Sequence, residues 1–197
     1  LQFVPKYEQR IFIPIAKQWR EILRSEMGFL PNPYVAGGPL QPNTTGLFVG
    51  RADVLRQLYA HLQNREHQPA ILLFGQRRMG KSSLLYQLPY KLDQDTIPVL
   101  VDCLSPPVTE GNAQFLSHIA KAIRSQSVEH RELRLPPIPS LENVPFTTFG
   151  QWFDEVESLL DSRILLLCLD EFENIGEAIN EGWLDKRVLG WLRNLIQ

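Results

Sequence analysis

The spacing of apolar residues predicts a chain of alternating helices and strands. Residues 13–26 carry apolar side chains at helical spacing and predict an amphipathic helix. Prolines and glycines are frequent up to residue 46, which indicates a linker, and helical spacing returns over residues 51–64. The run Ile71-Leu72-Leu73-Phe74 then predicts a short buried strand.

A further helix and strand follow this run. A helix is predicted from Lys81 to just before Pro89, because proline cannot continue the hydrogen-bond ladder of a helix. Val99–Asp102 predicts the next strand, and residues 115–123 predict the next helix through apolar positions three and four apart. Two strands joined through a helix form a βαβ unit, so we expect these strands to be parallel.

The last third of the chain continues the alternation. Thr148 and Gln151 form a capping-box pattern, which predicts the start of a helix. Ile164–Leu169 is apolar at every position, as is typical of a strand covered on both faces in a parallel sheet. Only one helix is expected after this strand, from about Trp183. The pattern therefore predicts an α/β fold.

Composition is that of an ordinary globular protein. Hydrophobic residues make up 44% and charged residues 21% of the 197 residues, which argues against a disordered or membrane-spanning chain. The formal net charge is −2, so no overall basic field favours nucleic acid or an anionic membrane. Two cysteines are too few for a disulfide framework, and no secretion signal opens the chain, so a cytoplasmic location is expected.

Residues 75–82 fit the pattern G-x-x-x-x-G-K-[ST] of a phosphate-binding loop, and they follow an apolar run and open a helix. This glycine loop consists of Gly75, Gln76, Arg77, Arg78, Met79, Gly80, Lys81 and Ser82. Its glycines allow backbone N–H groups to curl around phosphate oxygens, and the helix N-terminus adds positive charge. By analogy with the template, Lys81 binds the β- and γ-phosphates, Ser82 binds Mg²⁺, and Ser83 lies near the α-phosphate.

An acidic pair ends the apolar run of residues 164–169. Asp170 and Glu171 stand at the carboxyl end of a predicted parallel strand, where such sheets bind their ligands. We expect Asp170 to hold Mg²⁺ through water, and Glu171 to orient and deprotonate the attacking water. An acidic pair after a strand also occurs as a helix N-cap or a solvated turn, and this alternative stays open.

Three motifs occur in order along the chain: Phe48-Val49-Gly50-Arg51, the glycine loop followed by Ser83-Leu84-Leu85, and Asp170-Glu171-Phe172. Together they resemble the AAA+/STAND-type P-loop ATPases, in the branch of archaeal-type ATPases and signalling STAND NTPases. The resemblance covers residues 32–197 and implies a P-loop NTPase fold, with three α/β/α layers around a parallel sheet.

The resemblance also implies roles for further residues. In that family the first motif lines the adenine pocket, so Val49, Gly50 and Arg51 are expected to contact the base; a glycine-marked turn before a helix is the alternative. Arginine pairs such as Arg77 and Arg78 occur before the Gly-Lys step in this branch. They either meet phosphates or an acidic neighbour, or remain solvated.

The resemblance implies an incomplete domain. The family's core has five parallel strands, and the strand after the acidic pair lies between that pair's strand and the glycine-loop strand. Here only three strands are expected, so the sheet has an empty slot and we expect a fragment of a longer protein; an atypical minimal relative of the family is the alternative. The expected regions are a helix and linker start over residues 1–30, a linker over residues 31–47, and the N-terminal part of the ATPase domain over residues 48–197.

The leading hypothesis is an ATP-dependent regulatory or signalling switch, reset by hydrolysis with Lys81 and Glu171 as catalytic residues. One alternative is an origin-recognition-like ATPase acting on DNA, although this segment lacks a basic helix-turn-helix module. Another is a module that binds nucleotide without turnover. ATP and Mg²⁺ are the expected ligands, and the histidines show no metal-ligand spacing. We expect protein partners or self-association through regions outside this chain, and no nucleic acid or membrane span in this segment.

Overall fold

The computed structural model describes residues 38–40, 48–62, 70–76 and 78–195. The chain divides into two compact units, Leu1–Ala36 and Gly37–Gln197, and every described residue belongs to the second unit. The helix expected over residues 13–26 and most of the linker expected over residues 31–47 lie outside the described residues.

The described chain forms two strands, each preceded and followed by more than one helix. The elements are α2 (Ala52–Leu62), α3 (Lys81–Lys91), β1 (Thr96–Asp102), the short 3₁₀ helix η2 (Pro106–Val108), α4 (Asn112–Arg131), α5 (Pro145–Leu160), β2 (Ile164–Asp170), α6 (Glu173–Asn180) and α7 (Arg187–Asn194). β1 and β2 form a parallel two-stranded sheet, in register from Thr96 beside Ile164 to Asp102 beside Asp170. The expected mixture of helices with parallel strands is confirmed. No helix in the described part of the chain has the length and apolarity needed to cross a membrane.

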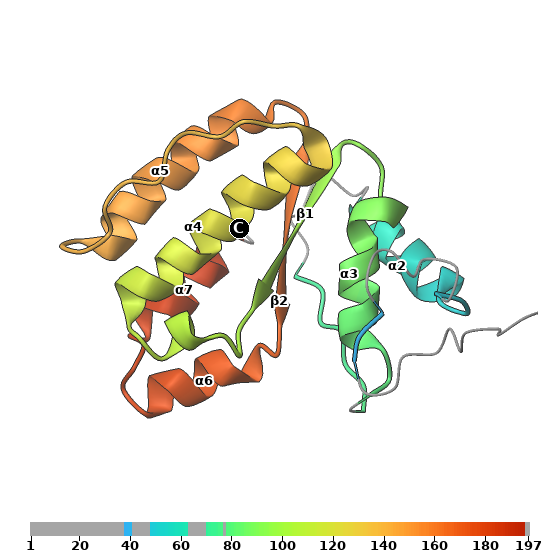
Figure 1. Ribbon diagram of the computed structural model, residues 1–197, viewed down its shortest axis with the longest axis horizontal. Helices are drawn as coiled ribbons and strands as arrows, with labels where there is room; N and C mark the ends of the chain where they lie inside the picture. Colours follow the sequence, from blue (N-terminus) through green and yellow to red (C-terminus); the bar gives the residue numbers. More distant parts are fainter. Residues whose placement is uncertain (1–37, 41–47, 63–69, 77, 196–197) are drawn as a thin grey trace, which may run out of the picture. The chain divides into compact units, whose positions relative to one another are not determined.

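Helices cover both faces of the two-stranded sheet. On one face, the fully buried Ile97, Val99 and Val101 pack in a core with residues of α4, α5, α6 and α7. On the other face, Cys168 packs with Leu62 of α2 and with residues of α3. Figure 1 shows α2 and α3 on one side of β1 and β2 and the other α-helices on the opposite side. Alternate residues of each strand thus face different cores, which explains why both strands are apolar almost throughout.

The outer edge of β1 is closed by side chains of α4. Gln126 accepts a hydrogen bond from the Leu100 N–H at 2.9 Å and donates one to the Leu100 carbonyl at 2.8 Å. Arg131 Nε donates to the Thr96 carbonyl at 2.8 Å. Pro98 lies between these positions on the same edge and has no N–H to offer. This edge therefore presents few backbone groups to which another strand would pair.

The outer edge of β2 is open within the described structure. β1 and β2 pair only with each other, and no described residue hydrogen-bonds to the edge of β2 that faces away from β1. The strand expected over residues 71–74 is wrong: this run is irregular, and Leu72 and Phe74 are 83% and 92% exposed. A strand requires a hydrogen-bonding neighbour, and the described part of the chain places none along this run.

Two helix boundaries differ from those expected. α3 continues through Pro89, because the missing N–H falls near the end of the helix, where the Leu92 N–H still donates to the Leu88 carbonyl at 2.9 Å. α5 begins at Pro145, three residues before Thr148, and no side chain caps its N-terminus, so the expected capping box is wrong. Proline suits the first helical position, because its fixed φ is helical and its absent N–H would have no partner there.

Two short helices follow β2, where only one was expected. α6 ends before Gly182, which has φ +81° and so takes a left-handed turn that favours glycine. The Trp183 N–H donates back to the Ala178 carbonyl at 2.8 Å, which closes the end of α6. α7 then covers the core through Trp191, whose ring meets that of Phe149 edge-on at 4.9 Å between centroids.

Candidate functional site

The glycine loop is closed by its own lysine. Lys81 Nζ donates hydrogen bonds to the carbonyl oxygens of Gly75 and Gln76, at 3.0 and 3.3 Å. The Met79 N–H donates to the Gln76 carbonyl at 3.3 Å, and Gly80 has φ +81°, which favours glycine. The loop is therefore a tight turn with a positive charge held across it.

The first turn of α3 directly follows this loop. The helix begins at Lys81, so its first N–H groups and the positive end of its dipole lie at the loop. Ser82 is half-buried in this turn. Ser83 is buried, and its hydroxyl accepts a hydrogen bond from the Leu40 N–H at 2.9 Å. The Ser83 hydroxyl therefore ties the segment at residue 40 to α3, which leaves Ser82 as the serine better placed for a ligand.

The middle of the loop is exposed. Arg78 has φ +65° and is exposed, and its guanidinium forms no ion pair with another described residue. Met79 is 52% exposed. Arg77 lies outside the described residues. Of the two alternatives for the arginine pair, the position of Arg78 fits a solvated side chain.

The motif at residues 48–51 lies against the glycine loop. The Arg51 guanidinium donates a hydrogen bond to the Met79 carbonyl, and the Arg51 carbonyl accepts one from the Leu55 N–H in the first turn of α2 at 3.0 Å. Gly50 has φ +78°, as in a glycine-marked turn before a helix, and Val49 is 79% exposed. Among these residues, Arg51 is therefore the one that touches the loop.

The carboxyl ends of β1 and β2 bring acidic residues together. The strand register places Asp102 beside Asp170, and the Cys103 N–H donates to the Asp170 carbonyl at 3.0 Å. Burial, together with the negative charges of Asp102, Asp170 and Glu173, raises the pKa of the Cys103 thiol to about 12. Three carboxylates thus lie around this buried cysteine.

Glu171 follows at the end of β2, exposed and with φ +52°. Asn174 holds this backbone conformation, because its N–H and its side-chain Nδ2 both donate to the Glu171 carbonyl, at 3.1 and 2.8 Å. Partial burial and the negative charges of Glu173 and Asp170 raise the pKa of Glu171, whereas the positive charge of Lys81 lowers it.

The glycine loop and the acidic pair lie at the same end of the sheet. In Figure 1 the N-terminal end of α3 and the carboxyl ends of β1 and β2 all point to the lower side of the view. Open α/β sheets bind their ligands outside the carboxyl ends of the strands. Lys81 at the start of α3 and Glu171 after β2, which are remote in the sequence, thus lie at the same end of the sheet, where a ligand would bind.

The described residues form no metal site by themselves. No group of three or more His, Cys, Asp or Glu side chains in the described ranges is arranged to hold a metal ion. Mg²⁺ in nucleotide sites keeps several waters and is held by one or two carboxylates together with phosphates. Asp170 and Ser82 supply oxygen donors of the kind that Mg²⁺ prefers, so the residues fit an ion that arrives with a nucleotide.

Two residues at this end of the sheet were not identified from the sequence. Asp102 could have been found, because Val-Leu-Val-Asp at the end of β1 repeats the pattern of Leu-Cys-Leu-Asp at the end of β2. Asn174 acts through its bonds to the backbone of Glu171, and no spacing rule predicts such a contact.

Comparisons of the chain with known protein families, with curated proteins and with solved structures give no match. The class that the structure defines is a mixed unit of helices and a two-stranded parallel sheet, with helices on both faces. The resemblance to P-loop ATPases rests on the three motifs.

Proposed function

We propose that this chain binds ATP at the glycine loop and belongs to the P-loop ATPases of the AAA+/STAND type. The observation that carries the proposal is the position of the glycine loop and the acidic pair: the start of α3 and the carboxyl end of β2 lie at the same end of the sheet (Figure 1). Two unrelated solvated turns would have no reason to meet at the ligand-binding end of one sheet. The bonds of Lys81 to Gly75 and Gln76 support it as well, because they hold the ammonium group over the loop.

The roles of the residues follow from their positions. The N–H groups of residues 75–83 and the Lys81 ammonium bind the phosphates, and Lys81 exchanges its carbonyl partners for phosphate oxygens. Ser82 and Asp170 hold Mg²⁺, which when bound neutralises phosphate charge. Arg51 positions the loop from the side of α2. The resemblance to the family assigns Val49 and Gly50 to the base side of the site.

Glu171 is the residue that we assign to turnover. It follows β2, at the end of the sheet where α3 and its loop begin, and there it orients a water molecule and takes its proton. Its raised pKa makes it a stronger base than an isolated glutamate. Hydrolysis would then reset a regulatory switch in the cytoplasm, with protein partners or self-association through regions outside this chain.

The test compares Lys81→Ala with Lys91→Ala, at the two ends of the same helix α3. ATP affinity is measured by calorimetry in Mg²⁺, with circular dichroism to check the fold. We expect Lys81→Ala to weaken binding by at least about tenfold and Lys91→Ala to leave it unchanged, because only Lys81 lies at the loop. Equal affinity of Lys81→Ala and the parent would refute the assignment.

Turnover is tested separately with Glu171→Gln. We expect this variant to retain ATP binding and to lose phosphate release, because the amide cannot accept the proton of the water. Binding without phosphate release in the parent chain itself would favour the alternative of a nucleotide-binding module without turnover.

A further inference from the structure

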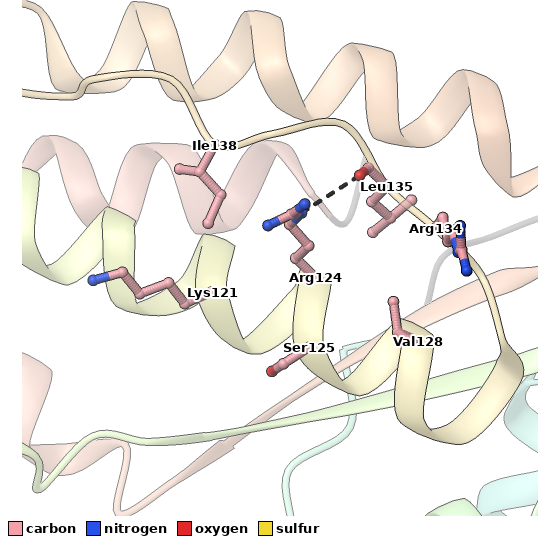
Figure 2. A pocket seen from close by; sticks show the side chains of 7 residues that line it. All are labelled: Lys121, Arg124, Ser125, Val128, Arg134, Leu135 and Ile138. Carbon is pink, nitrogen blue, oxygen red and sulfur yellow. Dashed lines mark hydrogen bonds between the residues drawn. The ribbon is translucent and has the colours of Figure 1, made fainter.

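A hollow of about 770 Å³ lies on the outer face of α4, away from the glycine loop. We call it the basic hollow; Lys121, Arg124 and Arg134 supply its charges, and Val128, Leu135 and Ile138 its apolar surface. Figure 2 shows the segment after α4 passing over the helix, so that the hollow lies between them. Its volume is within the range of ordinary ligand pockets.

The charges of the basic hollow are all positive. Three cationic side chains line it and no carboxylate does, although the whole chain carries a formal charge of −2. None of the three cations forms an ion pair with another described residue. An anionic ligand would therefore meet three cations that have no described carboxylate partner.

The apolar surface of the hollow is continuous with the core. Leu135 is only 6% exposed, whereas Val128 on α4 is 45% exposed. Arg124 rises from α4 toward the segment that carries Leu135 and Ile138, and its Nε donates to the Leu135 carbonyl at 3.5 Å (Figure 2). This long bond uses only Nε and leaves the other N–H groups of the guanidinium for a ligand.

We propose that the basic hollow binds an acidic peptide segment of a partner protein that also carries a large apolar side chain. Lys121, Arg124 and Arg134 would pair with the carboxylates, and Val128, Leu135 and Ile138 would cover the apolar side chain. Single-stranded nucleic acid fits less well, because the lining has no aromatic ring on which a base would stack. The proposal is independent of ATP binding, since the hollow shares no residue with the glycine loop.

The probe is a fluorescein-labelled peptide of alternating Glu, Asp, Leu and Phe, added to the full chain and followed by fluorescence anisotropy. We expect Arg124→Glu and Arg134→Glu each to weaken binding about tenfold, because each replaces an attraction by a repulsion. Lys186→Glu makes the same charge change at an exposed position outside the hollow, and we expect its effect to stay within about twofold. Circular dichroism establishes that each variant is folded, and Arg124→Lys is expected to retain most of the affinity.

A matched pair of variants tests whether the apolar side chains of the hollow contribute to peptide binding. Val128→Asn is compared with Leu159→Asn, because these side chains are 45% and 46% exposed and only Val128 lines the hollow. We expect Val128→Asn to weaken peptide binding by about threefold or more and Leu159→Asn to leave it unchanged.

Three results would overturn the proposal. The first is equal peptide affinity of the parent, Arg124→Glu and Arg134→Glu. The second is equal binding of a peptide in which lysines replace the acidic residues. The third is binding of phosphatidylserine vesicles that depends on Arg124 and Arg134 while the peptide does not bind, which would assign the hollow to a membrane surface.

Discussion

Arg51 joins the segment before α2 to the glycine loop through a single side chain. Its guanidinium donates a hydrogen bond to the Met79 carbonyl. Its own carbonyl accepts a hydrogen bond from the Leu55 N–H in the first turn of α2. The planar, permanently charged guanidinium suits this role, because its several donors keep a fixed geometry. The loop is thus held from α2 as well as from α3.

We therefore predict that Arg51→Ala weakens ATP binding without changing Mg²⁺ dependence. Loss of the bond to the Met79 carbonyl leaves the loop less ordered before the nucleotide arrives. The cost is about 1 kcal/mol, or about fivefold in Kd by calorimetry. Arg56→Ala, at an exposed position of α2, is the control and is expected to bind as the parent does. An Arg51→Ala chain that binds as tightly as the parent would remove this role.

Asp93 connects α2 with the start of β1. Its carboxylate accepts hydrogen bonds from the Tyr59 hydroxyl at 2.9 Å and from Thr96 Oγ1 at 2.8 Å. Partial burial acts to raise the pKa of Asp93, but these hydrogen bonds and the charge of Arg131 outweigh it, so the pKa lies below the usual 3.8. The folded chain therefore binds this proton more weakly than the unfolded chain does.

Because the pKa of Asp93 is lower in the folded chain than in the unfolded chain, Asp93 makes stability depend on pH. The contribution of Asp93 is fully present above the unfolded pKa and is lost as pH falls through the lower folded pKa. We predict that the urea midpoint falls less steeply below about pH 4 in Asp93→Asn than in the parent. Asp95→Asn, in the same turn, is expected to follow the parent. Parallel pH profiles for Asp93→Asn and the parent would contradict the prediction.

Gln126 of α4 covers the outer edge of β1 with its side chain. Its amide reproduces the donor and acceptor pair that a neighbouring strand would offer to Leu100. We predict that Gln126→Leu lowers the free energy of unfolding by about 1–3 kcal/mol, because both Leu100 groups lose their partners. Gln114→Leu, on the exposed side of the same helix, is expected to change it by less than about 0.5 kcal/mol. Urea unfolding followed by circular dichroism measures both, and equal midpoints would contradict this account.

The elements that could be predicted from the sequence are those whose pattern is local. Helical spacing identified α2 and α4, and continuous apolarity identified β2, because each pattern reports burial along one element. Residues 71–74 carry the same apolar pattern, but a strand also needs a neighbour, and that depends on distant parts of the chain. The edge bonds of Gln126 are long-range contacts that no periodicity contains.

The candidate site follows the same division. The sequence predicts the glycine loop from a spacing within eight residues, and the tight turn closed by Lys81 agrees with that spacing, whereas the strand expected before the loop is absent. The contact of Arg51 with Met79 depends on how α2 and α3 pack, and the pairing of Asp102 with Asp170 depends on strand register. Packing and register are properties of the folded chain, so these two contacts cannot be predicted from local sequence patterns.

Although the formal net charge of the whole chain is only −2, acidic and basic side chains gather in different places on the molecule. The carboxyl end of the sheet carries Asp102, Asp170 and Glu173 around one buried cysteine, with Glu171 directly after β2, whereas the basic hollow carries three cations. If ATP binds at the glycine loop, its phosphates approach the acidic end, and Lys81, the exposed Arg78 and the α3 dipole act against the repulsion. A divalent cation adds to this positive charge, so it contributes to electrostatic balance as well as to chemistry.

This balance predicts opposite effects of two neighbouring carboxylates. Asp102→Asn removes a repulsive charge that we do not assign to the metal, so ATP without Mg²⁺ binds about threefold more tightly and Mg-ATP binds as in the parent. Asp170→Asn removes a metal ligand, so the affinity gained on adding Mg²⁺ falls. Calorimetry in EDTA and in Mg²⁺ separates the two effects, with the exposed Asp154→Asn of α5 as control. If Asp102→Asn and Asp170→Asn respond alike in both buffers, the division of labour between the two strand ends is wrong.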